Sequence, residues 1–333
     1  MSFRVVLTDP DLHPPSEELE TVLAKCEARL DPRVCRAEAE LCRFCAGADA
    51  VLCARALVTR KVISHMRDCR IIARLGTGYD NIDAQAAGEA GIPVTNVPEF
   101  CTAEVAEHTM ALILACSRKL VALANQTQHG LWRPDAVMPA HRLSGKTIGL
   151  VGFGKIGRAV AERALAFGMR VLFFDPAPAA PASARFKRCA TLPELLRQAD
   201  VISLHLPLSD LTRGVIGREA FQQMKPGAVL INCARGAVVV ESELTAALRA
   251  GRLAAAGLDT LSEEPPAPDN PLLGLRNVVI TPHCAAHTVE ALKDLRQQAY
   301  EEVARALRGE PLLHIVNQKH LKSSATPLAA LTD

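Results

Sequence analysis

Short apolar runs alternate with polar, helix-like stretches over the first hundred residues. Apolar runs of about four to eight residues between polar segments are typical of buried strands in a parallel sheet. Runs of this kind fall at Arg4–Asp9, Ala50–Cys53, Ile71–Arg74 and Ile92–Val97, and Ser16–Leu30 has the pattern of a helix. The alternation predicts a small α/β unit with a parallel sheet.

The pattern changes after Pro98. Thr102–Gly130 predicts one helix of nearly thirty residues that is rich in Ala and Leu on more than one face. A helix that is apolar on several sides must be covered on several sides. We therefore interpret this segment as a connector between domains that also packs against a partner, and hypothesise that it forms the interface of a homodimer.

From Thr147 the alternation resumes, and six further apolar runs follow. These runs are 147–151, 171–174, 201–206, 228–232, 253–258 and 278–281. They predict a second, doubly wound parallel sheet with intervening helices. A last helix is predicted at Thr288–Arg308, and residues 318–333 are expected to form a weakly ordered tail.

The first run of the second sheet is followed by a G-x-G-x-x-G pattern. Its residues are Gly152, Phe153, Gly154, Lys155, Ile156 and Gly157. A helix-like stretch and a second strand then lead to Asp175, which stands 23 residues after Gly152. In a dinucleotide site the three glycines permit a tight turn, close approach of a pyrophosphate and close packing of the helix. The alternative is a glycine turn without a ligand.

The acid at the end of the second strand bears on the choice of cofactor. The Asp175 carboxylate would accept hydrogen bonds from the hydroxyls of an adenosine ribose, and its charge would repel a 2′-phosphate. The stretch therefore predicts NAD (as NADH in the reducing direction) rather than NADP.

Composition limits the class of protein. The chain has 333 residues, of which 49% are hydrophobic and 22% charged, with a net charge of +2. These values fit about two globular domains of a soluble protein. No block of like charge predicts nucleic acid as a partner, and no apolar stretch is long enough to span a membrane. The first residues lead directly into a strand, so we expect no signal peptide and a cytoplasmic location.

Eleven cysteines are scattered along the chain, and we expect them to be reduced thiols. Cys42 and Cys45 form a CxxC, but no second pair follows at the spacing of a zinc ribbon. We therefore expect no metal site, and a metal or redox role for this pair is the weaker alternative.

Three polar residues follow strands of the second predicted sheet, at the end where ligands of open α/β sheets bind. They are Arg235, Glu264 and His283. An imidazole carries protons near neutral pH, a neighbouring carboxylate would orient it, and an arginine can bind a substrate carboxylate and polarise a keto oxygen. The pattern alone does not favour His283 over His287, His108 or His205. Arg235 and Glu264 could also lie in solvated loops.

Seven motifs occur in order from about Arg74 to Asn317. They read ARLGTGYDNID, NVPEFCTAEVAEHT, LVGFGKIGRAVAERALAFG, ISLHLPLSDLTRGVIG, MKPGAVLINCARGAVV, GLDTLSEEPP and VVITPHCAAHT. Together they resemble the D-isomer-specific 2-hydroxyacid dehydrogenases. The resemblance implies an NAD-dependent oxidoreductase with two Rossmann-like or flavodoxin-like domains, the cofactor domain inserted into the substrate domain. The substrate domain would comprise residues 1–100 and 289–317, and the NAD-binding domain residues 101–288.

The resemblance also implies roles for single residues. His283 would be the general acid or base, Glu264 its paired acid, and Arg235 the group that binds the carboxylate and carbonyl of the substrate. The substrate-binding positions would be the backbone of Gly76, Thr77 and Gly78, together with Asn96. The cofactor cleft would be lined by His205, Pro207, Thr212, Cys233, Ala234 and Asp259, the last of which would fix the nicotinamide amide.

One departure concerns the residues after the catalytic histidine. Much of the sequence is similar to the subgroup of C-terminal-binding-protein corepressors, which carry a tryptophan there in an Ala-Trp-Tyr pattern. This chain has Ala286 in place of that indole, so the substrate is not implied by the subgroup. Two functions remain open: a dehydrogenase for a small acid such as glyoxylate or hydroxypyruvate, and a dimeric, NADH-sensing binding protein with little turnover. The complete Arg–Glu–His set favours the enzyme.

Overall fold

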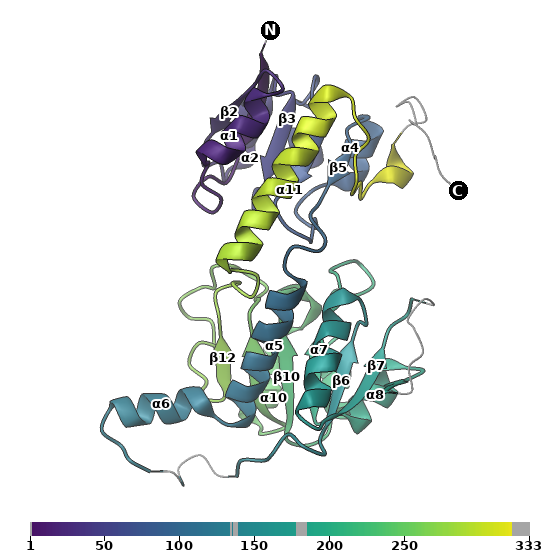
Figure 1. The fold of residues 1–333 in the computed structure, drawn as a ribbon. Helices are drawn as coiled ribbons and strands as arrows, with labels where there is room; N and C mark the ends of the chain where they lie inside the picture. Colours follow the sequence, from purple (N-terminus) through teal and green to yellow (C-terminus); the bar gives the residue numbers. More distant parts are fainter. Residues whose placement is uncertain (1, 134, 136–138, 178–184, 322–333) are drawn as a thin grey trace. The chain divides into compact units, whose positions relative to one another are not determined.

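The chain forms two compact units in the computed structural model, which describes residues 2–133, 135, 139–177 and 185–321. Unit 1 contains residues 1–100 and those from 288 onward, and unit 2 contains residues 101–287 (Figure 1). Each unit is built on one parallel sheet. The α/β class with two doubly wound sheets is therefore confirmed, and unit 2 is inserted into unit 1.

In the part of unit 1 that the structure describes, five strands lie in the order β2-β1-β3-β4-β5. The strands are β1 (Phe3–Leu7), β2 (Ala28–Pro32), β3 (Ala50–Cys53), β4 (Ile71–Arg74) and β5 (Val94–Thr95). The helices are α1 (Glu17–Ala24), α2 (Glu38–Cys45), α3 (Arg60–Ile63), α4 (Ala84–Glu89) and α11 (Val289–Arg308), followed by the 3₁₀ turn η3 (Gln318–His320). This strand order is that of flavodoxin-like sheets.

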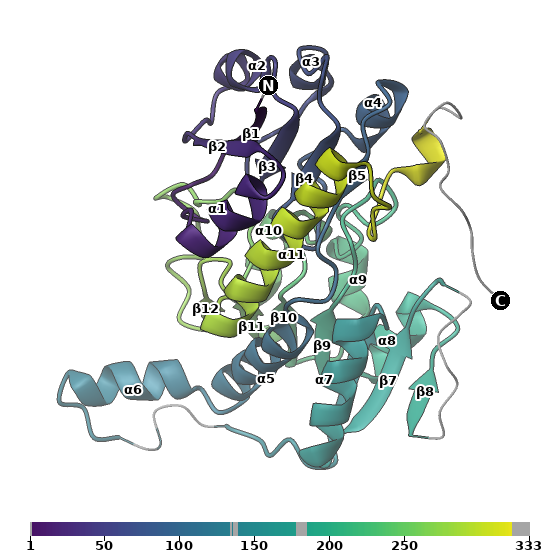
Figure 2. The ribbon, with the colours of Figure 1, turned by 45° about the horizontal axis from the view of Figure 1, so that its top comes forward.

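Side chains alternate between two cores in unit 1, because successive residues of a strand point to opposite faces. Val5 and Leu7 of β1 pack in the core that contains residues of α1 and α11. Val6, between them, packs in the core that contains residues of α2, α3 and α4. The helix α11 lies beside α1 (Figures 1 and 2) and buries Tyr300 in the first core. The last helix of the chain thus completes the unit that the first hundred residues begin.

The predicted helix Ser16–Leu30 is wrong in its second half. The helix α1 ends at Ala24, and the chain turns at Glu27, whose φ is 55°. Residues 28–32 then form β2, which pairs with β1 in parallel. Ala28 and Leu30 suit a helical or a strand period equally well, so the neighbouring strand β1 decides the outcome. The helix α2 was not predicted.

The described residues of unit 2 form seven parallel strands in the order β12-β11-β10-β9-β6-β7-β8. They are β6 (Thr147–Val151), β7 (Arg170–Phe174), β8 (Phe186–Arg188), β9 (Val201–Leu204), β10 (Ala228–Asn232), β11 (Leu253–Leu258) and β12 (Val278–Ile280). Its helices are α5 (Thr102–Ser117), α6 (Leu120–Gln128), α7 (Lys155–Ala166), α8 (Leu192–Gln198), α9 (Arg218–Gln223), the 3₁₀ turn η2 (Gly236–Val238) and α10 (Glu241–Arg249). The edge strand β8 was not predicted, because two of its three residues are charged.

The strand order of unit 2 reverses at β6, which has β7 on one side and β9 on the other. Crossovers on the two sides leave a crevice at the carboxyl ends of the strands, where ligands of such sheets bind. Residues of α5 and α7 pack on one face of the sheet, and residues of α8, α9 and α10 pack on the other. The glycine turn between β6 and α7 therefore lies at the switch point.

The predicted single helix Thr102–Gly130 is in fact two helices. The break is at Lys119, whose backbone is left-handed with a φ of 52°. The helix α5 buries seven side chains, whereas α6 buries none. Figure 1 shows α6 extending away from the sheet at the end of α5. The apolar residues of the two halves thus have different roles, which the continuous helical pattern concealed.

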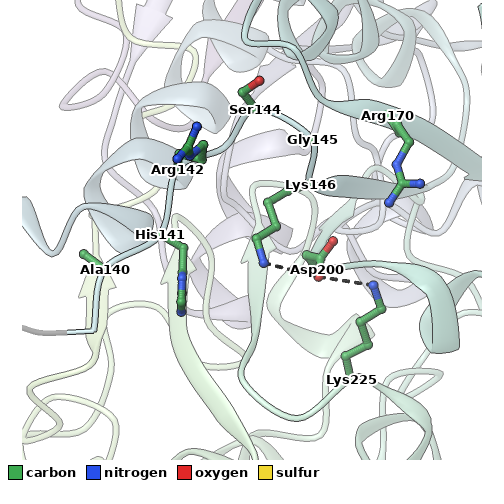
Figure 3. A pocket seen from close by; sticks show the side chains of 9 residues that line it. All are labelled: Ala140, His141, Arg142, Ser144, Gly145, Lys146, Arg170, Asp200 and Lys225. Carbon is green, nitrogen blue, oxygen red and sulfur yellow. Dashed lines mark hydrogen bonds and ion pairs between the residues drawn. The ribbon is translucent and has the colours of Figure 1, made fainter.

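A cluster of charged side chains lies at the amino ends of the strands in the unit 2 sheet (Figure 3). The Asp200 carboxylate accepts hydrogen bonds from the Thr147 N–H (2.8 Å) and Lys225 Nζ (3.1 Å). Burial alone would raise the pKa of Asp200, but these donors and the Lys225 charge hold it below its usual value. The cluster borders a hollow of about 600 Å³, at the edge of the sheet opposite the glycine turn.

Residues 318–320, which were expected to belong to a weakly ordered tail, form the turn η3. The Asn317 side chain accepts a hydrogen bond from the Val94 N–H (2.9 Å) and donates to the Ile92 carbonyl (3.0 Å). The turn η3 follows directly, and its His320 packs so closely on α4 that a Cβ at Gly88 would lie 2.4 Å from the His320 Cβ. Residues 322–333 lie outside the described residues. No helix in the described part of the chain is long and apolar enough to cross a membrane.

Candidate active site

The glycine turn is packed tightly at its first and third glycines, Gly152 and Gly157, and is open at its second, Gly154. A Cβ at Gly152, where φ is +95°, would lie 2.5 Å from the His205 carbonyl oxygen. A Cβ at Gly157 would lie 2.5 Å from the Gly152 carbonyl oxygen, whereas a Cβ at Gly154 would meet no atom within 4 Å. The first and third glycines are therefore needed by the fold, and the second keeps a space open beside the turn.

That open space lies at the start of α7. Gly154 is the N-cap residue of α7 and has no side chain to accept hydrogen bonds from the first turn of the helix. Such a helix start presents backbone N–H groups and a positive dipole end to an anion. Lys155 and Ile156 are the first residues of α7. Phe153 contributes backbone only, because its ring is buried and stacks on Phe173 at 3.9 Å.

The Asp175 carboxylate is fixed by backbone groups at the end of β7. Its Oδ2 accepts a hydrogen bond from the Phe153 N–H (2.7 Å), and its Oδ1 accepts one from the Ala177 N–H (2.8 Å). Each oxygen keeps a second lone pair for a hydroxyl donor. The glycine turn therefore positions the acid as well as the helix start, and the two are held as one rigid site.

The segment after β9 carries three of the predicted cofactor residues. His205 lies under the glycine turn, with its Nε2 3.0 Å from Ser203 Oγ. Burial lowers the pKa of His205 to about 4, so its ring is neutral at physiological pH. Thr212 Oγ1 donates to the Pro207 carbonyl (2.6 Å) and accepts from the Ser209 N–H (2.8 Å), which closes an exposed turn.

Arg235 is held by a buried asparagine at the end of β10. The Asn232 Oδ1 accepts from the Ala234 N–H (3.0 Å), and its Nδ2 donates to the Arg235 carbonyl (2.9 Å). Arg235 Nη1 donates to the Ala234 carbonyl (2.8 Å). The turn also contains Cys233, which is half-buried. Asn232 was not predicted as a site residue, although an amide at the end of the otherwise apolar strand β10 is a signal that could have indicated it.

Glu264 and His283 form a close pair. His283 Nδ1 lies 2.6 Å from Glu264 Oε2, and Glu264 Oε1 accepts a hydrogen bond from the Leu261 N–H at 3.1 Å. His283 has a left-handed backbone with a φ of 53°. A non-glycine residue in that conformation is uncommon, and strained residues of this kind cluster at functional sites. The structure thus pairs Glu264 with His283, which the sequence pattern could not single out among the histidines.

The turn that carries Arg235 and the loop that carries Glu264 pack against each other at Gly236. A Cβ at this position would lie 1.9 Å from the Leu261 carbonyl carbon, so only glycine fits between the two segments. Leu261 in turn binds the Glu264 carboxylate through its N–H. Arg235 and Glu264 therefore stand on segments whose relative position is fixed by backbone packing.

Asp259 is buried at the end of β11, with 2% of its surface exposed. Its Oδ1 accepts hydrogen bonds from Thr281 Oγ1 (2.6 Å) and the Cys284 N–H (2.9 Å), and its Oδ2 accepts from the Ala285 N–H (2.9 Å). His108 of α5 adds its Nε2 at 3.5 Å from Oδ1. No pattern in the sequence predicted that His108 and Thr281 would contact this acid.

In unit 1, the predicted substrate-binding residues are one loop and the asparagine that is hydrogen-bonded to it. The loop Gly76-Thr77-Gly78 follows β4, and Gly76 has a φ of +143°. Asn96 Nδ2 donates to the Thr77 carbonyl (2.6 Å), and Thr77 Oγ1 donates to the Val97 carbonyl (3.0 Å). Asn96 thus holds the shape of the loop from the segment after β5.

Cys42 and Cys45 are part of a hydrophobic core of unit 1. Both are buried free thiols, and burial raises the pKa of Cys45 to about 12. A protonated thiol in an apolar core is a packing residue. The structure supports this interpretation of the CxxC over a metal or redox site.

Comparison with known proteins identifies the family of the chain. Residues 110–285 match the family described as D-isomer specific 2-hydroxyacid dehydrogenase, NAD binding domain. The D-3-phosphoglycerate dehydrogenase of Methanocaldococcus jannaschii is 42% identical over 266 residues, which are 79% of this chain and 50% of that protein. This chain therefore spans about half the length of that relative.

Two other similar proteins are matched over most of their length. The hydroxypyruvate reductase of Thermotoga maritima is 41% identical over 75% of this chain and 81% of its own. The crystal structure of a glyoxylate reductase from Paecilomyes thermophila has a TM-score of 0.85 and 29% identity, and covers 96% of this chain and 99% of its own. These relatives bear the names of dehydrogenases and reductases and not of corepressors, so the expected nearness to C-terminal-binding proteins gains no support. The chain belongs to the D-isomer specific 2-hydroxyacid dehydrogenase family.

Proposed function

We propose that this protein is an NAD-dependent oxidoreductase that interconverts a small D-2-hydroxyacid and the matching 2-ketoacid, with a substrate like glyoxylate or hydroxypyruvate. The observation that carries the proposal is the 2.6 Å contact between His283 Nδ1 and Glu264 Oε2. This pair follows strands of the same sheet that bears the glycine turn. The names of the hydroxypyruvate reductase and glyoxylate reductase relatives support this substrate class.

The residues at the switch point fit a dinucleotide. The space left open at Gly154 and the uncapped start of α7 would take the pyrophosphate, and Asp175 would take the ribose hydroxyls. The cofactor cleft would continue along His205, Pro207, Thr212, Cys233 and Ala234, with Asp259 at the nicotinamide amide. When bound, NADH supplies the hydride that reduces C2 of the ketoacid.

His283 is the proton carrier in this proposal. Its Nδ1 is engaged by Glu264, so its Nε2 is the ring nitrogen that faces other partners. With both nitrogens protonated, Nδ1–H donates to the carboxylate and Nε2–H can donate its proton to the keto oxygen. Glu264 stabilises the imidazolium and fixes the orientation of the ring. In the oxidising direction the neutral ring takes the hydroxyl proton at Nε2.

Arg235 and the loop of unit 1 would bind the substrate. A guanidinium offers N–H donors in a planar fork that matches the two oxygens of a carboxylate. Arg235 would bind the substrate carboxylate in this way and polarise the carbonyl oxygen. In unit 1, the backbone of Gly76, Thr77 and Gly78 would bind the carboxylate, with Asn96 holding the loop.

We further propose that two copies of the chain associate through the helix α6 and the neighbouring residues Leu131 and Trp132. Leu120 of α6 and Trp132 beyond it have 59% and 85% of their surface exposed, and α6 buries no residue in its own unit. A groove of about 900 Å³ runs beside α6 and is lined in part by Val121, Leu131 and Val279. An apolar surface of this kind is typical of an interface, and a second copy offers a matching surface.

Substitution of the open Gly154 and of the tightly packed Gly157 should have different effects, on NADH binding and on stability respectively. Gly154→Ala should weaken NADH binding by about tenfold or more, equal to 1.4 kcal/mol, while the melting temperature stays near that of the parent protein. Gly157→Ala should lower the melting temperature, because its Cβ would lie 2.5 Å from the Gly152 carbonyl. Fluorescence titration and thermal unfolding measure both effects. Normal NADH binding by Gly154→Ala would contradict the assigned phosphate position.

His283→Ala should lower the turnover of the preferred ketoacid by a factor on the order of 10² to 10⁴, with little change in NADH binding. Glu264→Gln should lower turnover and shift the pH profile, because it changes the charge beside the imidazole. The assay is NADH oxidation with glyoxylate, hydroxypyruvate, pyruvate and longer or branched 2-ketoacids. Near-normal turnover by His283→Ala would exclude its role. Tight NADH binding without turnover of any acid would favour the sensing protein.

Asp175→Ala should improve the use of NADPH relative to NADH, because it removes a charge that repels the 2′-phosphate. The ratio of kcat/KM for the two cofactors measures this effect. Asp175→Asn is the matched control for shape, and should also shift the ratio toward NADPH. A ratio that stays unchanged in both variants would count against the ribose-binding role.

Light scattering should give twice the chain mass of 35.7 kDa. Leu120→Asp should shift the protein toward the monomer, since it places a charge in the proposed interface. Leu313→Asp, at a residue of unit 1 that is 60% exposed, is the matched control and should leave the mass unchanged. A monomeric parent protein would refute the proposed dimer.

A further inference from the structure

A histidine, a carboxylate and a thiol converge in unit 2 without a role for all three in the proposed reaction. They are His108 of α5, Asp259 after β11 and Cys284 after β12. One ligand atom from each, including His108 nitrogen and Cys284 Sγ, lies within 4.8 Å of the others. We call these three residues the Asp259 cluster. They belong to three separate segments of one rigid unit, so the fold alone brings them together.

The spacing within the cluster suits a shared ion. His108 Nε2 and Asp259 Oδ1 are 3.5 Å apart, which is longer than an ordinary N–H···O hydrogen bond of about 2.7–3.2 Å. In tetrahedral zinc sites the ligand bonds of about 2.0–2.3 Å place two ligand atoms roughly 3.3–3.6 Å apart. Cys284 Sγ lies within 4.8 Å of both, so it would have to move toward the ion to bind it. The Thr281 hydroxyl donates to Asp259 Oδ1 (2.6 Å) and is hydrogen-bonded to His108 Nε2 (2.9 Å), and the ion would replace the bond to His108.

The charge balance of the cluster also favours a cation. Asp259 is buried, and the only ion-pair partner that the described residues offer it is His108. The other groups on its oxygens are neutral N–H and O–H donors. A buried carboxylate without a permanent cation gains from a bound positive ion. Imidazole, carboxylate and thiolate together select zinc or a similar borderline ion over magnesium or calcium, which prefer oxygen.

Cys284 must lose its proton to become a ligand. Binding of the ion therefore releases one proton from Cys284 Sγ, and the electron pair left on sulfur forms the bond to the metal. The fourth position, toward Thr281, is left for water. No change of oxidation state is involved.

We propose that Zn²⁺ binds His108, Asp259 and Cys284 and thereby competes with NADH. The competition rests on the proposed function, in which Asp259 holds the nicotinamide amide. An ion on Asp259 Oδ1 occupies that acceptor and places a positive charge beside the oxidisable ring. The metal is thus an inhibitor that binds only when NADH is absent from the cofactor cleft, and it takes no part in hydride transfer.

Cobalt titration tests the site without any assay of activity. Co²⁺ is the probe, because a thiolate bound to cobalt gives a charge-transfer absorption band that oxygen and nitrogen ligands do not. One equivalent should give the band, and Zn²⁺ should remove it. Cys284→Ala should abolish the band, and His108→Ala should weaken Co²⁺ binding by about tenfold or more, as loss of a metal ligand does.

The matched control is Cys233→Ala. Cys233 is the other cysteine that is not fully buried, and it is absent from the Asp259 cluster, so its replacement should leave the band unchanged. Melting temperatures of the three variants establish that each is folded. A band that persists in Cys284→Ala, or the absence of a band in the folded parent protein, would overturn the proposed site.

NADH titration with and without Zn²⁺ tests the competition. The apparent Kd for NADH should rise linearly with the Zn²⁺ concentration in the parent protein and stay constant in Cys284→Ala. A cobalt band together with NADH binding that Zn²⁺ does not affect would refute the competition. If the metal-free protein does not bind NADH at all, the proposed function fails, while the cobalt band still decides whether the metal site exists.

Discussion

The backbone of the glycine turn lies directly against the end of β9, and the candidate site of unit 2 depends on that contact. Gly152 meets the His205 carbonyl and Gly157 meets the Gly152 carbonyl at distances that exclude a Cβ. Because the chain turns this sharply, α7 starts at the switch point of the sheet and the Phe153 N–H reaches Asp175. A single steric constraint thus sets the open space at Gly154, the helix start and the orientation of the acid.

A second set of backbone contacts holds the groups proposed for the chemistry. Asn232 shapes the turn that carries Arg235, and Gly236 packs that turn against Leu261. Leu261 then fixes Glu264, which contacts His283. Charged side chains at such a site are costly to orient one by one. Here backbone contacts at the ends of the strands hold the segments that carry them, so less side-chain entropy remains to be lost when a substrate binds.

Local patterns in the sequence determined the sheets and the nucleotide turn. Short apolar runs such as Ile71–Arg74 are typical of strands buried on both faces, and the spacing from Gly152 to Asp175 fits one strand–helix–strand unit. These signals are local, because each depends on residues within about one βαβ unit. The resemblance carried by seven ordered motifs, and not periodicity, predicted Arg235, Glu264 and His283 as the candidate catalytic set.

The tertiary structure decided what neighbouring residues in the sequence cannot. Residues 28–32 form a strand because β1 lies beside them, and the helix expected through Gly130 breaks at Lys119, since α5 is covered by its own unit and α6 is not. Pairing of His283 with Glu264, and not another histidine, required the loops after β11 and β12 to meet. His108 joined Asp259 and Cys284 for the same reason. Contacts between distant segments carry no local periodicity, so the sequence specified the elements and the packed fold alone specified their partners.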